Sequence, residues 1–371
     1  MKVMICKESW LGPSETFIRN QVDAIEAWEV VGGGLIGEQS PLVHNGEFAL
    51  YGDSRMDRLL YRVALRVGSH RLTRLLESTR PDVVHAHFAS AALVIAPSAR
   101  RRRIPLVVTL HGHDVTALPE VRGRRGRRYR RRLKRLFRQA DLLIAVSQHI
   151  RARAIALGAP EEKVTVHHIG VPLADVPAID QQRAIDVLFI GRLTPKKGLV
   201  DLIEAIGALA DPSAVRLVVA GDGPLRTEVT ELARARGVRA EFLGAVDTAR
   251  VQELLAASRV VAVPSRTAPS GDSEGLPTVA VEAAAAGLPV VGTRHAGIPE
   301  IVVDRETGIL VEEGDREGIA SALEELLRDE ALRVRLGRAA RRRVEQQFDI
   351  VQQTRRLEQL YAASVSGERG S

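Results

Sequence analysis

DVLFIGRLTPKKGLVDLIEAIGAL, residues 186–209, is the stretch that decides the fold. It opens with Asp186–Ile190, an apolar run without polar alternation, which is typical of a strand buried on both faces. The loop Gly191–Gly198 follows, and Leu199–Leu209 has the apolar spacing of a helix. A buried strand that leads through a loop into a helix is the unit from which parallel sheets are built.

The same alternation of apolar runs and helical patterns extends over the whole chain, in two series. The first series ends near residues 168–182, where the stretch lacks periodicity and contains Pro172 and Pro177. The other predicted strands are Lys2–Cys6, Asp82–His85, Leu106–Leu110, Leu142–Val146, Val164–Ile169, Arg216–Ala220, Val260–Val263 and Val290–Gly292. The other predicted helices are Glu15–Trp28, Leu225–Arg236, Thr248–Ala257, Thr278–Ala286, Arg316–Arg328 and Val351–Tyr361.

The sequence therefore predicts an α/β protein with two Rossmann-like domains, whose parallel sheets face each other across a cleft. We expect the domains to span residues 1–172 and 173–349, with a helix at 350–363 that packs back on the first domain. In open parallel sheets, ligands bind beyond the C-terminal ends of the strands. Functional residues are therefore expected directly after the predicted strands.

Composition narrows the class of protein. The chain has 371 residues, 45% of them hydrophobic and 27% charged, which suits a folded protein of about two domains. A single cysteine, Cys6, excludes an intramolecular disulfide and a cysteine-based zinc site. No apolar run reaches the roughly 18 residues that span a bilayer, and the start MKVMICKESW is too short and too soon charged for a signal peptide. We expect a location in the cytoplasm or at the inner face of the cytoplasmic membrane.

The loop Gly191–Gly198 places Arg192, Lys196 and Lys197 between a strand and a helix. Fixed cations beside a helix N-terminus form an anion site, because the unpaired amides and the helix dipole add to the side-chain charge. The glycine spacing fits neither a Walker loop nor a dinucleotide-binding fingerprint. A basic surface turn is the alternative interpretation.

The segment Ser273–Glu282, SEGLPTVAVE, carries two carboxylates eight positions apart. Pro277 suits the first turn of a helix, so Glu274 is expected in the loop before that helix and Glu282 inside it. The helix is nearly all Ala and Val, and a carboxylate buried in it needs a partner. The hydroxyls of a ribose would supply one. The alternative is an arginine beside Glu282 and solvent around Glu274.

The turn His111–Asp114, HGHD, comes directly after the predicted strand Leu106–Leu110. His and Asp at a strand end are candidates to orient a substrate hydroxyl. A turn capped by Asp114 is the alternative. A zinc site from His85, His87, His111 and His113 is a weaker one, because no matching ligand spacing supports it. Gly221–Pro224, GDGP, is a second turn after a predicted strand.

Taken in order, the motifs GRLTPKKG, GDGPLR, VPS, EGLPTVAVEAAAAGLPVV and GIPEIV resemble the retaining family 4 glycosyltransferases of GT-B fold. SETFIRNQ, HAHFA around His87 and HGHD are similar to the same family, and to members that build bacterial exopolysaccharides. The resemblance extends from about Ser14 to Tyr361. It implies an enzyme that moves a hexosyl-type sugar from a nucleotide-diphosphate sugar to an acceptor hydroxyl, in polysaccharide or glycolipid biosynthesis.

The resemblance also implies roles for single residues, with donor bound by the second domain and acceptor by the first. Arg192 and Lys197 would hold the diphosphate, Glu274 would face the donor sugar hydroxyls, Glu282 would take the ribose and His111 would lie near the transferring sugar. The implied catalytic set is His111, Glu274, Arg192 and Lys197. The other donor-side candidates are Gly221, Gly223, Gly275, Leu276, Pro277 and Thr278. The acceptor-side candidates are Gly12, Ser14, Thr16, His87 and Asp114.

Many relatives carry a Gly-Gly pair in the loop after the first strand, whereas this loop, Ser9–Ser14, offers only Gly12. Gly32–Gly34 comes too late to replace the pair and is expected at a strand-to-loop turn. No metal or other cofactor is implied, because the cations can neutralise the leaving group, and the donor is expected to be a UDP- or GDP-sugar. The implied mechanism is front-face transfer with retention, in which the departing phosphate oxygen takes the acceptor proton.

Residues 122–138 hold ten Arg and one Lys without an acid, in a chain of net charge +7. A solvated helix face is one interpretation. Docking on anionic lipid, with Leu133, Leu136 and Phe137 as the apolar stripe, is another. Nucleic acid is not expected, because no helix-turn-helix, RRM or aromatic interleaving accompanies the charge.

The acceptor is left open between a carbohydrate, a lipid-linked and a small molecule. Glycosylation of a small soluble natural product is the alternative function. A non-catalytic protein that binds nucleotide sugar or nucleic acid is a more distant one.

Overall fold

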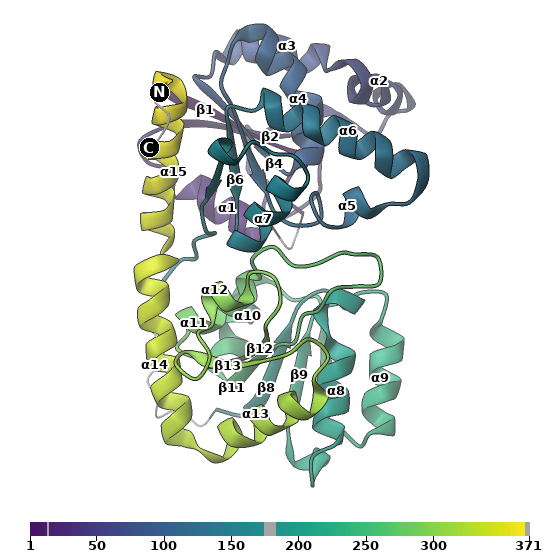
Figure 1. Ribbon diagram of the computed structural model, residues 1–371, viewed down its shortest axis with the longest axis vertical. Helices are drawn as coiled ribbons and strands as arrows, with labels where there is room; N and C mark the ends of the chain where they lie inside the picture. The colour runs from purple at the N-terminus through teal and green to yellow at the C-terminus, as the bar shows by residue number, and fades with distance from the viewer. Residues whose placement is uncertain (13–14, 174–182, 368–371) are drawn as a thin grey trace. The chain divides into compact units, whose positions relative to one another are not determined.

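The chain folds around two separate parallel sheets, one in each of two units (Figure 1). The computed structural model describes residues 1–12, 15–173 and 183–367. The N-terminal unit comprises Met1–Gly170 and the segment from Ile350 onward, and the C-terminal unit comprises Val171–Asp349. The candidate Ser14, and residues 174–182 of the expected joint, lie outside the described residues.

The sheet of the N-terminal unit has the strand order β3-β2-β1-β4-β5-β6-β7, and every neighbouring pair is parallel. The order reverses beside β1, which pairs with both β2 and β4; α/β proteins bind ligands at such a point. β4 and β5 are buried at every residue, although His85 and His87 belong to β4. The strands are β1 (Lys2–Ser9), β2 (Glu29–Ile36), β3 (Phe48–Tyr51), β4 (Val83–His87), β5 (Leu106–Leu110), β6 (Leu142–Ala145) and β7 (Val164–Val166).

Helices pack on this sheet, and one of them comes from the far end of the chain. The helices are α1 (Thr16–Asp23), α2 (Arg55–Val67), α3 (His70–Thr79), α4 (Ala89–Arg102), α5 (Ala117–Glu120), α6 (Gly123–Gln139), α7 (Gln148–Ala156) and α15 (Ile350–Ser366), with a short 3₁₀ turn at Glu161–Lys163. Leu357 and Tyr361 of α15 lie in the same buried cluster as Val3 and Ile18. The hydroxyl of Tyr361 is 2.6 Å from Nδ1 of His85. The carboxylate of Glu358 accepts hydrogen bonds from the amides of Glu26 and Ala27.

The sheet of the C-terminal unit has the order β10-β9-β8-β11-β12-β13, again parallel throughout. Its strands are β8 (Ile185–Ile190), β9 (Leu217–Ala220), β10 (Ala240–Gly244), β11 (Ser258–Val263), β12 (Val290–Thr293) and β13 (Gly308–Val311). Its helices are α8 (Leu199–Gly207), α9 (Arg226–Ala235), α10 (Thr248–Ala256), α11 (Thr278–Ala285), α12 (Ile298–Ile301), α13 (Arg316–Arg328) and α14 (Glu330–Gln347), with 3₁₀ turns at Pro195–Lys197 and Pro212–Ala214.

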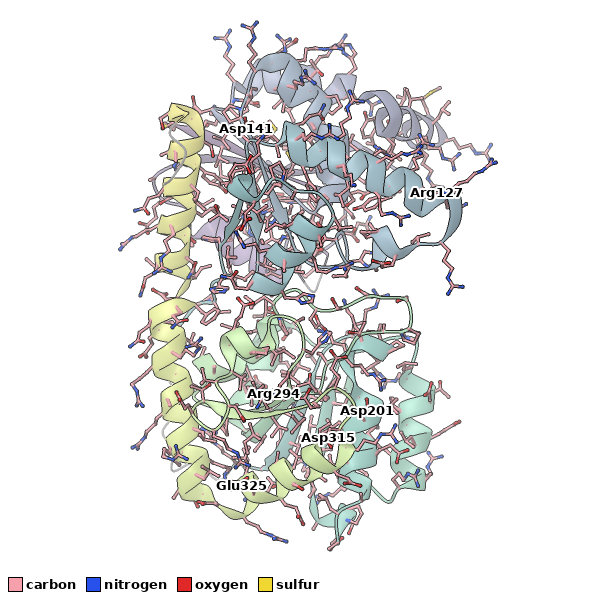
Figure 2. The ribbon with its side chains drawn as sticks, viewed as in Figure 1. Arg127, Asp141, Asp201, Arg294, Asp315 and Glu325 are labelled. Atoms are coloured by element: carbon pink, nitrogen blue, oxygen red, sulfur yellow. The ribbon has the colours of Figure 1, made fainter. Side chains whose placement is uncertain are left out.

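A buried acid fixes one end of this sheet. Asp201 on α8, labelled in Figure 2, is 2% exposed. Its carboxylate accepts from Nη1 of Arg266 at 2.8 Å and from Nε of Arg316 at 3.0 Å. Because Arg266 lies in the loop after β11, this carboxylate ties that loop to α8 and to the start of α13. The loop is thereby held beside Lys196, whose carbonyl accepts the Arg266 amide.

The α/β prediction is confirmed, but four strands and several helices are missing from the sequence interpretation. The strands β3, β10 and β13 are only four or five residues long, so their apolar runs are too short to stand out. The expected turn at Gly32–Gly34 is wrong, because these glycines lie inside β2. A Cβ on Gly33 would lie 2.3 Å from the carbonyl oxygen of Phe48, so this glycine lets β3 approach closely.

The expected lipid-binding stripe on the basic segment is also wrong. The segment forms α6, and Leu133, Leu136 and Phe137 are buried in the N-terminal unit, where α6 packs on α4. These three side chains therefore belong to the core and leave the basic face exposed. Within the described residues, no helix is long and apolar enough to cross a membrane.

Candidate functional site

The loop after β8 is held in one conformation by tight glycine contacts. Gly198 ends the 3₁₀ turn and caps α8 with φ +69°, and a Cβ there would lie 1.8 Å from the carbonyl oxygen of Pro264. The loop after β9 packs against it, since a Cβ on Gly221 would lie 1.9 Å from the Gly191 carbonyl and one on Gly223 would lie 2.5 Å from the Leu193 carbonyl. Gly221 and Gly223 therefore allow the two loops to meet.

The cation of this loop meets the first carboxylate of SEGLPTVAVE. Nζ of Lys197 is 2.8 Å from Oε1 of Glu274, and the Ser265 hydroxyl donates to the same oxygen at 3.4 Å. The Glu274 carboxylate is buried, which by itself raises its pKa. Lys197 and Lys196 more than offset that effect, so the pKa of Glu274 is lowered below its usual value. Glu274 is thus an ionised carboxylate at neutral pH.

A histidine and a second acid fix the backbone of Glu274. His295 is 2% exposed, and its Nε2 accepts the Glu274 amide at 3.2 Å. Its Nδ1 lies 2.6 Å from Oε1 of Glu313, and Oε2 of Glu313 accepts the Thr267 amide. Since Nε2 accepts, Nδ1 carries the proton and donates a hydrogen bond to Glu313. Sequence reasoning missed both residues, although His295 follows β12 and stands two positions before the GIPEIV motif.

The second carboxylate has a different environment. Glu282 lies half-buried on α11, a helix of mostly Val and Ala, and its carboxylate has no hydrogen-bond or ion-pair partner among the described residues. Burial raises the pKa of Glu282 to about 7. The alternative of an arginine partner is therefore not what the structure shows. A carboxylate held in this state has accepting oxygens available for the hydroxyls of a ligand.

The remaining donor-side candidates lie in the loop after β8 and at the start of α11. Arg192 is exposed, and no carboxylate pairs with it in the part of the chain that the structure describes. Gly275, Leu276 and Pro277 are buried in the loop before α11, Pro277 caps the helix, and Thr278 is its first residue. The first amides of a helix lack acceptors within the helix, so this start adds hydrogen-bond donors next to Glu274. The arrangement offers cations and amides for phosphate, and carboxylates for hydroxyls.

In the N-terminal unit, two candidate histidines form a pair. Nδ1 of His87 is 2.9 Å from Nε2 of His111, and their rings stack with centroids 5.2 Å apart. The rings of Phe17 and Phe88 lie against His111. Burial lowers the pKa of His111 to about 3 and that of His87 well below its usual value, so both rings are neutral at pH 7.

A small cavity adjoins this pair. Gln21, His87 and His111 are among its lining residues. The Gln21 Oε1 and His87 Nε2 atoms are buried without a hydrogen-bond partner among the described residues, and a water or a substrate hydroxyl could satisfy them. His85, by contrast, uses Nδ1 with Tyr361 and Nε2 with Thr109. The described ranges contain no group of three or more side chains placed to hold a metal ion.

The other acceptor-side candidates hold backbone in place. Asp114 is 1% exposed, and its two oxygens accept the amides of Ala89 and Gly112, at 2.8 and 3.0 Å. It therefore fixes the start of α4 and the turn that carries His111. Burial raises the pKa of Asp114, although backbone amides oppose the shift. The Gly12 amide donates to Glu15, which pairs with Lys7, and Thr16 begins α1.

Comparisons with known proteins place this chain in a family. The family described as "Glycosyltransferase Family 4" matches residues 40–175, and the family described as "Glycosyl transferases group 1" matches residues 177–343. WcaL of Escherichia coli strain K12, named as a colanic acid biosynthesis glycosyltransferase, is 32% identical over 286 residues, which cover 73% of this chain and 68% of WcaL. The chain belongs to the family 4 glycosyltransferases. The amylovoran biosynthesis glycosyltransferase AmsK of Erwinia amylovora is 31% identical over 280 residues, covering 72% of this glycosyltransferase and 67% of AmsK.

A solved structure agrees on the fold. The structure of Anabaena Alr3699/HepE in complex with UDP superposes with a TM-score of 0.78, at 22% identity, over 98% of this glycosyltransferase and 100% of that chain. The two parallel sheets, in units of seven and six strands, are accordingly those of a GT-B enzyme. The predicted family and fold are confirmed.

Proposed function

We propose that this glycosyltransferase moves a hexosyl residue from a UDP- or GDP-sugar to an acceptor hydroxyl, with retention of the anomeric configuration, in the biosynthesis of a polysaccharide or glycolipid. The observation that carries the proposal is the Lys197–Glu274 pair at 2.8 Å, together with the Glu282 carboxylate on the next helix, α11, which has no partner among the described residues. The names of WcaL and AmsK, which refer to colanic acid and amylovoran biosynthesis, support a carbohydrate or lipid-linked acceptor. The complex of HepE with UDP-glucose supports a nucleotide-sugar donor.

In this proposal the C-terminal unit binds the donor. Arg192 and Lys197 hold the diphosphate together with the amides at the start of α11. Glu282 accepts the ribose hydroxyls, and Glu274 accepts hydroxyls of the sugar. Gly221, Gly223, Gly275, Leu276 and Pro277 shape the loops that carry these groups. Because a lysine and an arginine can stabilise the charge that develops on the leaving phosphate, the proposal needs no metal ion and no cofactor.

The N-terminal unit binds the acceptor. His111 lies beside the transferring sugar as a neutral ring, which His87 orients through its hydrogen bond. Gly12, Thr16 and Asp114 shape the surrounding loops. The departing phosphate oxygen takes the acceptor proton, so the proposed front-face mechanism needs no protein base. The proposed location is the cytoplasm, which suits a chain whose single cysteine, Cys6, is a buried thiol.

The test is nucleotide release from a panel of UDP-, GDP- and ADP-sugars. The expected result is slow hydrolysis of one donor, reduced at least about 100-fold by Glu274→Ala and unchanged by Glu231→Ala. Glu231 is a suitable control because it is an exposed glutamate on α9 of the same unit. Proton NMR of the glycosylated product then reads the anomeric configuration. Inversion would overturn the retaining mechanism, and release without loss in Glu274→Ala would overturn the site.

A further inference from the structure

The small cavity beside the His87–His111 pair contains two polar atoms whose hydrogen bonds are missing. Oε1 of Gln21 and Nε2 of His87 are both buried, and neither has a partner in the described part of the chain. All residues that line the cavity belong to the N-terminal unit. Buried polar atoms are normally bonded to protein or to ordered water, because an unpaired one costs free energy. The two atoms therefore indicate that the cavity is occupied.

The cavity has room for a single water. The space open to the centre of a water molecule is about 10 Å³, which is close to the minimum that one ordered water needs. A sugar ring or a phosphate group is too large for that space. Thr109 and His167 also line the cavity, so its wall is polar, as the site of a buried water must be.

The helix α1 holds Gln21 toward the cavity. Phe17 and Gln21 stand four positions apart on α1, which places them on one face of the helix. Both side chains line the cavity. The Phe17 ring also lies against His111, with ring centroids 5.2 Å apart. One face of α1 thus supplies a packing contact to His111 and the accepting oxygen of Gln21.

The ring of His87 is fixed by packing, so only the position of its proton is left to set. His87 is 1% exposed, and its ring packs against those of His85 and His111, with centroids 4.4 and 5.2 Å apart. Both nitrogens of His85 are already bonded, to Tyr361 and Thr109. Burial holds the pKa of His87 well below its usual value. The neutral ring carries one proton, on Nδ1 or on Nε2.

The accepting oxygen of Gln21 decides between these two positions. Because an amide oxygen only accepts, a water in the cavity donates one hydrogen to Oε1 of Gln21. The other unpaired atom, Nε2 of His87, takes the second hydrogen only when it carries no proton itself. The His87 proton then lies on Nδ1, which donates to Nε2 of His111 at 2.9 Å. With the proton on Nε2, neither unpaired atom would accept the second hydrogen of the water.

The same arrangement fixes the proton of His111. Burial lowers the pKa of His111 to about 3, so this ring is neutral as well. Since its Nε2 accepts from His87, its one proton lies on Nδ1. Nδ1 has no hydrogen-bond partner among the described residues. It is therefore available to donate to an oxygen of a ligand.

We propose that Gln21 is a positioning residue, which acts through one ordered water on His87 and thereby makes Nδ1 of His111 a hydrogen-bond donor to a hydroxyl oxygen of the transferring sugar. Gln21 itself does not touch the sugar. The inference rests on the proposed function for the place of His111 beside that sugar. The water and the protonation of the two rings do not depend on that function.

The first experiment is long-range proton–nitrogen-15 NMR of the full chain with labelled histidine, which distinguishes rings protonated at Nδ1 from rings protonated at Nε2. In the wild type we expect His87 and His111 both to be protonated at Nδ1. Gln21→Met removes the accepting oxygen at similar side-chain length, so the water can accept from Nε2 of His87. We expect the Nε2-protonated form to appear in both rings of this variant.

The matched control is Gln359→Met, the same change at an exposed glutamine of α15 in the same unit. It should leave both rings as they are in the wild type. A wild-type His111 protonated at Nε2, or rings that do not change in Gln21→Met, would overturn the proposal. So would a crystal structure whose cavity is empty between Gln21 and His87.

Donor hydrolysis supplies a second measurement. Gln21→Met should lower kcat about 10-fold, because one hydrogen bond to the sugar is weakened. The Kd for free UDP or GDP should change by less than about 3-fold, because the nucleotide site is distant. Thermal unfolding should match that of Gln359→Met, which excludes a loss of fold. An unchanged kcat would overturn the positioning role. Full hydrolysis in Glu274→Ala would instead overturn the proposed function, and the NMR experiment would still decide how Gln21 acts on the histidines.

Discussion

Lys197 and Glu274 come from loops that follow different strands, and their charged groups meet at 2.8 Å with only 19% and 9% of the two side chains exposed. In the free enzyme the cation assigned to phosphate therefore neutralises the carboxylate assigned to sugar. A nucleotide sugar must engage both groups in place of this contact. Lys197 keeps the buried Glu274 carboxylate ionised. Loss of either partner would leave the other charge buried without compensation.

Removal of Lys197 should therefore harm the fold as well as the activity. Lys197→Met leaves Glu274 buried with less compensation, and we expect a loss of about 2 kcal/mol in the free energy of unfolding at pH 8. Lys197→Met/Glu274→Gln should recover most of that loss while hydrolysis of the donor stays at least about 100-fold below wild type. Urea unfolding and nucleotide release measure the two effects. A double variant as unstable as the single one would contradict this account of the pair.

Removal of the Glu282 charge should stabilise the fold, although it should weaken nucleotide binding. Its folded-state pKa, about 7, exceeds the ordinary value of 4.5, so the folded chain holds this proton more tightly than the unfolded chain. Stability from this group is present below about pH 4.5 and is lost as the pH rises through 7. Glu282→Gln should be more stable than wild type by about 1–3 kcal/mol at pH 8, and the difference should vanish near pH 4.5.

The same variant should bind free UDP or GDP at least about 10-fold more weakly, since the amide offers one accepting oxygen and no charge to the ribose. Affinity of the wild type should fall below pH 7 more steeply than that of Glu282→Gln. Calorimetry at several pH values separates this from titration of the nucleotide, which is common to both proteins. Identical pH profiles would show that Glu282 does not contact the ligand.

His295 and Glu313 should act as positioning residues for Glu274. His295→Ala releases the Glu274 amide, and we expect donor hydrolysis to fall about 10–100-fold, since misplacement of a site group by about 1 Å has an effect of that order. The Kd for free nucleotide, which lacks the sugar, should change less than 3-fold. Glu313→Gln retains an oxygen for the His295 Nδ1–H and should keep most of the activity. Equal weakening of hydrolysis and nucleotide binding would indicate a general loss of structure instead.

Gly221 should be irreplaceable for steric reasons. Gly221→Ala places a Cβ 1.9 Å from the Gly191 carbonyl at a φ of +143°, and we expect a loss of at least about 3 kcal/mol with weaker nucleotide binding. Gly237→Ala is the control, because Gly237 also has positive φ, +66°, but a Cβ there meets nothing within 4 Å. Its loss should stay near 1 kcal/mol. Thermal unfolding compares the two, and similar losses would assign the effect to φ alone.

Much of the fold could be predicted because its strands are buried on both faces. The bounds of β5 and α13 are those expected, and the loop Gly191–Gly198 lies where the strand Asp186–Ile190 led us to expect it. β2 could not be recognised, because its glycines interrupt the apolar run that is typical of a buried strand. Neighbouring residues pack too closely against these glycines to leave room for side chains. The family was readable from motifs, because these combine several residues at fixed spacing.

The site was predictable only in its local parts. Glu274 and Lys197 stand in motifs, whereas their contact joins positions 77 apart and no spacing reveals it. The sequence does not indicate a role for His295 or Glu313. A single histidine after one strand, and a single acid after another, are too common to predict a functional site. Asp114 was recognised as a polar residue at a strand end, but its hydrogen bond to the Ala89 amide runs backward to a helix that the sequence did not predict.

The position of α15 determines the order in which the two units can complete their folding. The N-terminal unit depends on Tyr361 against His85 and on Glu358 at the amides of Glu26 and Ala27. The C-terminal unit is contiguous between Val171 and Asp349. During synthesis on the ribosome, all residues of the C-terminal unit are therefore available before those of the N-terminal unit. Until α15 has been synthesised, the sheet of the N-terminal unit stays partly uncovered. A nascent chain halted before residue 350 should expose the part of the N-terminal unit that α15 covers, and chaperones should bind there. The C-terminal unit should already be folded in such a chain.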